Sequence, residues 1–548
     1  MKFDLPPTST EQPPIFTSLE ACGVWQKALP LSSPIQAQAQ LLRQLHLLNR
    51  YTLDADTRLA MLETLREAIH FVQEEGEKKF SGKPLPLAPP DQAALDAAHG
   101  LWQALATGYL RCLEACPAAP VNPADSASQA ALICQRALAA LAEDQADLVR
   151  SGHQPKDAHW RLVHRLYARA ETLGVAMTPV LDRLRNTHPL TPAAVYSEMM
   201  LCSAASLHEL LPRQQVWVMR WARLWAGKVK IQTTPPDLKT PALPLCVDLD
   251  GSTPASFKPG SGPGARWLET TELRKSLKRR LTLLAKGDPA DTPARLGLGE
   301  DCQEPQCGEV LRRIYPRWVK GGILRRYERH PLRGICRFVA GIDVIHYYLS
   351  GHQAFKPPGS TSTGDLRRQR EELATFGRIA SRFEEEYSRN HGYQLESWEV
   401  VEDWGLLDQS SGGLRLVRSL TQPGGRLGIG QMVAVQPTGT SGLLLGTVRW
   451  VQVTADNLAA GIQLIPGEPI PAAVRSTGVM AQQDEYKPAF LLPPLEALDL
   501  PASIILLTGG FKQERIVEVW TETTTRQVKL RSLLDRGAGF ERASYTEI

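Results

Sequence analysis

Apolar residues recur at intervals of three and four positions from residue 36 to residue 226. The clearest run, with charged residues in the positions between, comprises Leu59, Leu62, Leu65, Ile69 and Val72. This spacing lines one face of an α-helix with apolar side chains. We therefore expect residues 1–230 to form a helical bundle or a helical-repeat-like domain. The aromatic-rich run at 216–225 has helical spacing too, which favours core packing over a ligand-binding role.

The helical spacing is interrupted over residues 231–320. Prolines and glycines are dense between positions 233 and 264, where they surround one short apolar run at 245–249. Such residues break regular elements and are typical of linkers and turns. Helical spacing returns over 269–285 and 308–319. We expect a Pro/Gly-rich linker with one short strand, followed by two helices.

Near residue 330 the pattern changes to the two-residue alternation of β-strands. Residues 334–349 alternate as a strand pair or as one bent strand. Short strand-like runs separated by glycine-containing turns follow at 398–404, 413–417, 432–436, 443–453 and 461–465. This close spacing indicates a small antiparallel barrel over residues 321–480.

Two further segments complete the expected architecture. A helical pattern at 365–390 predicts an insertion in the barrel at about residues 352–394. Strand patterns within residues 481–548 predict a strand-rich C-terminal extension, which would form an added sheet. The expected fold class is multidomain α+β: a helical N-terminal domain, then an antiparallel β-barrel with a helical insertion and extra C-terminal strands. A chain of 548 residues has room for about three or four domains.

The composition is that of a globular protein. Hydrophobic residues make up 43% of the chain and charged residues 22%, unlike a disordered chain or a membrane protein. No uncharged apolar run approaches the ~20 residues that span a bilayer, and the N-terminus lacks a signal-peptide pattern, so we expect a cytoplasmic protein without a membrane span. The nine cysteines are scattered and odd in number, and we interpret them as reduced thiols.

The strongest local charge excess lies around the start of the predicted barrel. Only two acidic residues, Glu309 and Glu328, accompany Arg312, Arg313, Arg317, Lys320, Arg325, Arg326, Arg329, Arg333 and Arg337. A planar guanidinium can bind a phosphate or a guanine edge through two parallel hydrogen bonds, and it can stack on a base. This segment therefore suits a ligand with phosphate and guanine groups, whereas a solvated helix face is the alternative interpretation of a charge run.

A second polar element, Asp-Gln-Ser-Ser-Gly-Gly at 408–413, lies between two predicted strands. Asp408 can accept hydrogen bonds from a guanine edge, Ser410 can donate to a phosphate or a base, and Gly413 allows close backbone approach. Taken alone, such a string is also typical of an ordinary turn.

In this order and strand context, the two elements resemble the PilZ domain, the bacterial family of cyclic di-GMP receptors. The resemblance covers residues 325–475 and includes Arg-His-Pro-Leu-Arg at 329–333, the string at 408–413, Gly-Thr-Val-Arg-Trp-Val at 446–451 and Ala-Gly-Ile-Gln-Leu at 460–464. The two motifs lie farther apart than is usual in that family, and the predicted insertion accounts for the distance because loop closure costs grow slowly with length.

The resemblance implies which residues bind the ligand. Arg329 and Arg333 would hold its phosphates and guanine edges, and Arg325 and Arg326 would be auxiliary phosphate contacts. The other side of a guanine base would be received by Asp408, Ser410 and Gly413.

The resemblance also implies a non-enzymatic receptor that needs no cofactor or metal. Cyclic di-GMP would be its ligand, and the helical N-terminal region would transmit the signal to a protein partner. One alternative is a degenerate PilZ-like scaffold that binds only protein partners. We do not expect nucleic acid as a ligand, because the basic segment lacks the interleaved aromatic residues of single-strand binders. Motility, pilus assembly, polysaccharide secretion and transcription are all compatible outputs.

Overall fold

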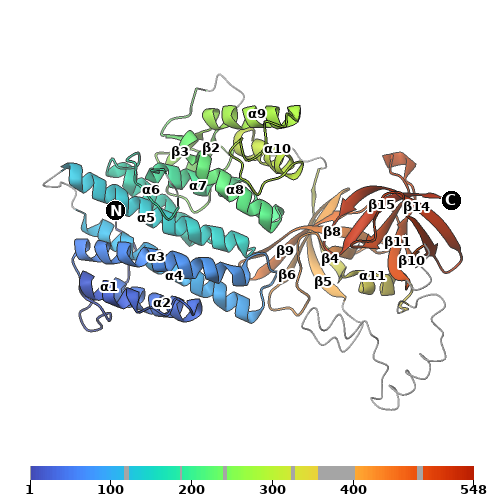
Figure 1. Ribbon diagram of the computed structural model, residues 1–548, viewed down its shortest axis with the longest axis horizontal. Helices are drawn as coiled ribbons and strands as arrows, with labels where there is room; N and C mark the ends of the chain where they lie inside the picture. Colours follow the sequence, from blue (N-terminus) through green and yellow to red (C-terminus); the bar gives the residue numbers. More distant parts are fainter. Residues whose placement is uncertain are drawn as a thin grey trace, which may run out of the picture. The chain divides into compact units, whose positions relative to one another are not determined.

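The structure is a computed structural model that describes residues 2–116, 123–185, 188–237, 243–258, 260–321, 328–353, 355, 401–477 and 485–548. The chain forms two compact units. The first comprises Met1–Lys83, Leu87–Arg326 and Gln452–Ala455. The second comprises Pro84–Pro86, Tyr327–Val451 and Asp456–Ile548. Figure 1 shows the first unit as mainly helical and the second as mainly β-stranded.

Helices dominate the first unit up to residue 225, as expected. They are α1 (Leu19–Lys27), α2 (Pro34–Arg50), α3 (Ala55–Phe80), α4 (Pro89–Ala115), α5 (Pro123–Arg150), α6 (Asp157–Thr172), α7 (Pro192–Ala204) and α8 (Pro212–Trp225). The long helices α3, α4 and α5 run side by side (Figure 1). The apolar stripe predicted between residues 59 and 72 is buried along α3. Asp54 caps that helix by accepting a hydrogen bond of 2.8 Å from the backbone N of Thr57.

The tryptophans of α8 are core residues, which confirms the prediction for residues 216–225. Trp217, Trp221 and Trp225 are all buried. The indole of Trp221 donates to the carbonyl oxygen of Leu298 at 2.9 Å, and the Arg280 guanidinium lies 4.9 Å from the ring centre of Trp225. Each ring therefore fills core volume while its polar or π surface finds a partner.

Residues 230–319 pack into the same hydrophobic core as the helices. They contain a three-stranded antiparallel sheet in the order β1 (Lys230–Gln232), β3 (Ala265–Glu269), β2 (Leu245–Asp248). The predicted strand at 245–249 is β2, and the two predicted helices are α9 (Thr271–Lys286) and α10 (Gln306–Val319). The sequence pattern missed β1 and β3, which are short and lie next to prolines or glycines.

The interpretation of all nine cysteines as reduced thiols was wrong for one pair. Cys302 and Cys307 form a disulfide with their Cα atoms 5.4 Å apart. The chain folds back just before α10, and this turn brings two cysteines five positions apart within bonding distance. The other seven cysteines are free.

The predicted antiparallel barrel is present in the second unit. It closes in the order β4-β5-β6-β9-β8-β7. We call it barrel 1. Its strands are β4 (His330–Ala340), β5 (Glu402–Ser410), β6 (Gly413–Ser419), β7 (Met432–Pro437), β8 (Leu444–Thr454) and β9 (Asn457–Leu464). The helix predicted at 365–390, within the proposed insertion, lies outside the described residues.

The prediction of strand structure up to residue 349 was wrong after Ala340. Gly341 has a φ of 94°, which turns the chain, and α11 (Ile342–Leu349) follows. The apolar residues of this segment also fit helical spacing, since Val344, Ile345 and Tyr348 all pack in one core cluster. A short apolar run is ambiguous between the two periods, and tertiary packing decided in favour of the helix.

The C-terminal strands form a second closed barrel rather than an added sheet. Barrel 2 has the order β10-β11-β12-β15-β14-β13. The strands are β10 (Ile470–Ser476), β11 (Lys487–Leu492), β12 (Ser503–Leu507), β13 (Ile516–Trp520), β14 (Thr525–Arg536) and β15 (Phe540–Glu547). A core cluster that includes Val344, Met432 and Phe490 joins α11 and both barrels. Closure leaves no long unpaired edge in either sheet.

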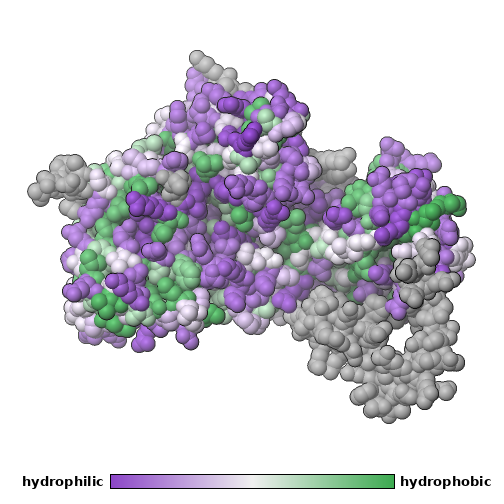
Figure 2. Space-filling view, in the orientation of Figure 1, coloured by the Kyte–Doolittle hydropathy of each residue, from purple (hydrophilic) through white to green (hydrophobic). Residues whose placement is uncertain are grey.

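The surface of the first unit is mixed in character. Figure 2 shows hydrophilic residues over most of the drawn face and apolar residues gathered over α1 and α2. Exposed apolar residues of these two helices include Leu19 and Val24 of α1 and Ile35 of α2. Among the described residues, no helix is both long enough and apolar enough to cross a membrane.

Candidate functional site

The two predicted motifs meet on neighbouring strands of barrel 1. Arg329 immediately precedes β4, and Asp408 lies near the end of β5. The antiparallel register places Pro331 opposite Asp408 and His330 opposite Gln409. An ion pair of 2.5 Å joins the Arg329 Nη1 atom to the Asp408 Oδ1 atom. Strand pairing thus brings together residues that are distant in the sequence.

Irregularities in the ladder turn Asp408 toward the outside of the barrel. On β5 the buried residues are Glu402, Trp404 and Leu406, and strict alternation would also point Asp408 inward. A register shift after Leu406 instead pairs Asp408 with Arg415, an exposed residue of β6. The extra residue of a β-bulge reverses the alternation and re-aims the next side chain.

A matching irregularity displaces Arg333 on β4. The register shifts between Pro331 and Gly334, so that Leu332 and Arg333 fall within the bulge. Arg333 is exposed, and among the described residues it has no hydrogen-bond or ion-pair partner. Arg333 thus lies on the same strand ladder as the Arg329–Asp408 pair. The auxiliary residues Arg325 and Arg326 lie outside the described residues.

The turn between β5 and β6 is closed by Ser410 and Gly413. The Ser410 hydroxyl donates to the carbonyl oxygen of Gly413 at 3.4 Å, and the two residues pair across the turn. A Cβ atom on Gly413 would lie 2.4 Å from the carbonyl oxygen of Ile462 on β9. Gly413 is thus required by the close approach of three strands, which is a structural role in addition to the predicted ligand contact.

Two residues of this face were not predicted as site residues. Arg415 is exposed on β6 directly opposite Asp408, and Gly461 of β9 pairs with Arg415. Trp450 of β8 covers Gly461, since a Cβ atom there would come 2.0 Å from the indole Nε1 atom. Alternation in Leu414-Arg415-Leu416 was a signal for the outward arginine. The occurrence of Trp450 on one strand and Gly461 on the next strand along the chain was a signal that the indole covers the glycine.

The outer face of β4, β5, β6, β9 and β8 therefore combines three kinds of chemistry. It has the guanidinium groups of Arg329, Arg333 and Arg415, the carboxylate of Asp408 and the aromatic ring of Trp450. Guanidinium groups bind phosphates, a carboxylate accepts from an amide-like base edge, and an indole provides a stacking surface. In the described parts of the chain, no group of histidine, cysteine and acidic side chains could hold a metal ion.

Known proteins match both ends of the chain. Residues 20–237 match the family model "Cyclic-di-GMP receptor FimW, N-terminal domain", and residues 472–548 match "FimW C-terminal beta-barrel domain". The second match coincides with barrel 2. Along nearly its whole length the chain is 24% identical to the cyclic-di-GMP receptor FimW of Pseudomonas aeruginosa, covering 94% of this chain and 88% of the relative. The chain is therefore similar in its helical region, its C-terminal barrel and its overall extent to a protein named as a receptor rather than as an enzyme.

Proposed function

We propose that this protein is a receptor for cyclic di-GMP and that the outer face of barrel 1 binds the dinucleotide. The main support is the pairing of Arg329 with Asp408, because it unites the two halves of a PilZ-like motif at one place on the surface. The similarity to a protein named as a cyclic-di-GMP receptor points to the same ligand.

Each side chain has a role that follows from its chemistry. Arg333 and Arg329 bind phosphate oxygens or the guanine O6 and N7 atoms through their planar guanidinium groups. Asp408 accepts hydrogen bonds from the N1 and N2 groups of a guanine. Ser410 donates to a phosphate or a base from the turn after β5. Arg415 adds positive charge beside Asp408, and Trp450 stacks on a base.

The ion pair also suggests how the ligand enters. In the ligand-free chain Arg329 neutralises Asp408, and both side chains are partly exposed, at 27% and 19%. A guanine edge can replace Arg329 as the partner of Asp408, and a phosphate can replace Asp408 as the partner of Arg329. Neither charge is then left without a partner, which avoids the desolvation cost that opposes most exchanges of buried charge.

The receptor produces its output through the helical N-terminal region, which contacts a protein partner. This region includes residues 20–237, which match the N-terminal domain of a protein named as a cyclic-di-GMP receptor. A protein of this kind needs ligand binding and a surface for a partner, but no catalytic group.

Calorimetric titration of the intact protein with cyclic di-GMP tests this function, with GTP and single-stranded RNA as controls. We expect saturable binding of cyclic di-GMP without added metal. Asp408→Ala and Ser410→Ala should each weaken binding by roughly 1–3 kcal/mol, the usual effect of removing one partner from a polar contact. Absence of binding by the folded wild-type protein would favour the scaffold alternative, and unchanged affinity in both variants would move the site elsewhere.

A further inference from the structure

The segment that joins α6 to α7 has an unusual distribution of side chains. Three of its apolar residues, Met177, Leu181 and Leu184, are exposed by 73%, 43% and 40%, whereas Val180 between them is buried. Two of its three charged residues in 177–185, Asp182 and Arg185, are almost completely buried, at 1% and 7%. A single exposed leucine would need no explanation. Charged side chains are rarely buried, however, and two buried charges beside three exposed apolar side chains in one short segment are unusual.

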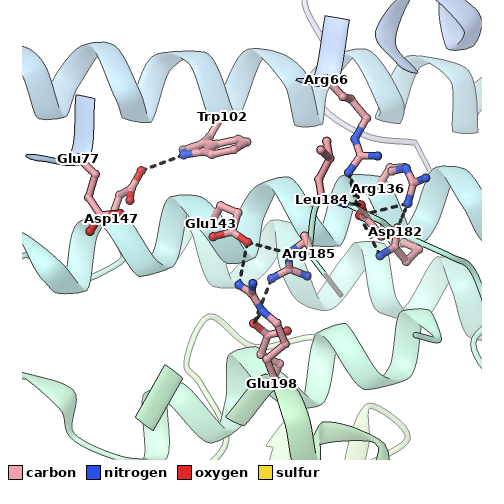
Figure 3. Close-up of polar contacts among 12 residues, drawn as sticks. Arg66, Glu77, Trp102, Arg136, Glu143, Asp147, Asp182, Leu184, Arg185 and Glu198 are labelled. Carbon is pink, nitrogen blue, oxygen red and sulfur yellow. Dashed lines mark hydrogen bonds and ion pairs between the residues drawn. The ribbon is translucent and has the colours of Figure 1, made fainter. Parts of the chain in front are cut away.

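Asp182 fixes the middle of the segment to α3 and α5. The Arg66 Nη2 atom lies 2.8 Å from each carboxylate oxygen, and the Arg136 Nη1 atom lies 3.1 Å from Oδ2 (Figure 3). The same carboxylate accepts a hydrogen bond of 3.3 Å from the backbone N of Leu184. Arg136 also donates to the carbonyl oxygen of Leu181 at 3.2 Å. The backbone beside both exposed leucines is therefore held.

Arg185 fixes the end of the segment to α5 and α7. Its Nε atom lies 2.7 Å from Glu143 and its Nη2 atom 3.0 Å from Glu198. Arg223 of α8 binds the same two carboxylates, at 2.8 Å and 3.1 Å. Figure 3 shows this group of charges inside the helical unit, between the helices.

These anchors define a conformation more than they add stability. A buried ion pair gains little net free energy, because desolvation of both ions offsets their attraction. Its effect here is to hold residues 177–185 in one conformation, although Met177, Leu181 and Leu184 of this segment remain exposed. A surface that is already ordered loses less conformational freedom on binding, so its affinity is higher for the same contact area.

We propose that residues 177–184 are the surface by which the helical unit binds its protein partner. The partner should offer an apolar depression that receives Leu181 and Leu184, with carboxylates at its rim. We expect carboxylates on the partner because Arg183, which lies between the two leucines, is positively charged. It is the one exposed charged side chain in residues 177–185. The inference rests on the proposed function in that it names the output surface of the receptor.

Site-specific cross-linking in cells tests this surface with the full chain. Leu181 is replaced by p-benzoylphenylalanine, and the same replacement at Leu224, an exposed leucine of α8, is the control. We expect a discrete protein adduct from position 181 and none from position 224. The cross-linked partner is then identified by mass spectrometry and purified. It is titrated with point variants of this chain that do not carry p-benzoylphenylalanine.

In that titration Leu184→Asp and Arg183→Glu should each weaken binding by about tenfold or more, since they put charge in an apolar contact or reverse the complementary charge. Leu224→Asp should have no effect. Met177→Asp replaces Leu184→Asp if the melting curve shows that the latter does not fold. All variants should bind cyclic di-GMP as the wild type does, which separates failure of this surface from failure of the receptor function.

Several results would overturn the inference. An adduct that contains only a second copy of this chain would make the segment a self-association surface. Loss of partner binding in Val24→Asp, with Leu184→Asp unaffected, would assign the contact to the apolar residues over α1 and α2. If Arg183→Glu binds the partner with the same affinity as the wild type, the proposed carboxylates at the partner's rim are contradicted.

Discussion

Arg329 and Asp408 form an ion pair across the first two strands of barrel 1, although the predicted insertion separates them in the sequence. Both side chains are partly exposed to solvent. An ion pair of this kind contributes only about 0–1 kcal/mol to folding stability. A need for stability therefore gives little reason for the pair, whereas the proposed ligand site gives a reason for its position on the same strand ladder as Arg333.

Asp408→Ala should separate these two effects. Loss of a partly exposed ion pair should lower the free energy of unfolding by about 1 kcal/mol or less. Loss of a base-recognition group should reduce affinity for cyclic di-GMP by more than this. Urea unfolding and ligand titration of the same preparation measure both quantities, and a large stability loss with unchanged affinity would show that the pair is structural.

Gly413→Ala should destabilise barrel 1. Its new Cβ atom would lie 2.4 Å from the carbonyl oxygen of Ile462, and a backbone atom cannot move away cheaply. We expect a loss of roughly 1–3 kcal/mol in the free energy of unfolding, typical of overpacking. Gly442→Ala is the matched control, because a Cβ atom there meets nothing within 4 Å. Equal melting temperatures for the two variants would contradict the close approach.

The regular parts of the fold could be predicted from the sequence because their periodicity is strong. The stripe from Leu59 to Val72 and the alternation around Leu414 and Leu416 both place buried residues correctly. Segment 342–349 could not be assigned in this way, since its apolar residues fit both a strand and a helix. Packing of α11 against strands of both barrels settles the choice, and such packing has no local signature.

For the candidate site, the sequence could predict only which residue types take part. Asp408 and Arg329 could be named from the motif, but their contact depends on strand register. The outward direction of Asp408 depends on a bulge after Leu406, which no turn residue announces. Arg415 and Trp450 were not predicted as site residues, because their position near Asp408 follows from the pairing of neighbouring strands rather than from spacing along one strand.

Trp450 should contribute to affinity through stacking. Trp450→Ala should weaken cyclic di-GMP binding by about 1–3 kcal/mol, the range for loss of one base–aromatic contact. Trp450→Phe should retain much of the affinity, because it keeps an aromatic face. Isothermal titration of both variants checks this, and equal losses for Ala and Phe would argue that the indole only fills the space over Gly461.

Asp147 should give the helical unit a characteristic pH dependence. Burial raises the pKa of its carboxyl to about 7, although Arg150 and the Trp102 indole act in the opposite direction. The folded state therefore holds a proton more tightly than the unfolded state. The resulting stabilisation is complete below the unfolded pKa of about 4 and is lost as the pH rises toward 7.

Asp147→Asn removes this titration while its amide oxygen can still accept from Trp102, which lies 2.9 Å from Asp147. The variant should gain stability relative to the wild type as the pH is raised from 5 to about 8. Urea unfolding at several pH values measures the difference. A difference that stays constant across this range would mean that Asp147 does not titrate there.

The receptor account is tested most directly by titrating cyclic di-GMP into Arg333→Lys and Arg337→Lys at two salt concentrations. Both arginines are exposed on β4, and Arg337 instead donates to Gln436 at 3.2 Å on the side of β7. Lysine keeps the charge but cannot form the planar two-point contact. We predict a loss on the order of tenfold or more for Arg333→Lys and almost none for Arg337→Lys. Equal, mild losses in both variants with a steep salt dependence would indicate a nonspecific basic patch and would contradict the proposed site.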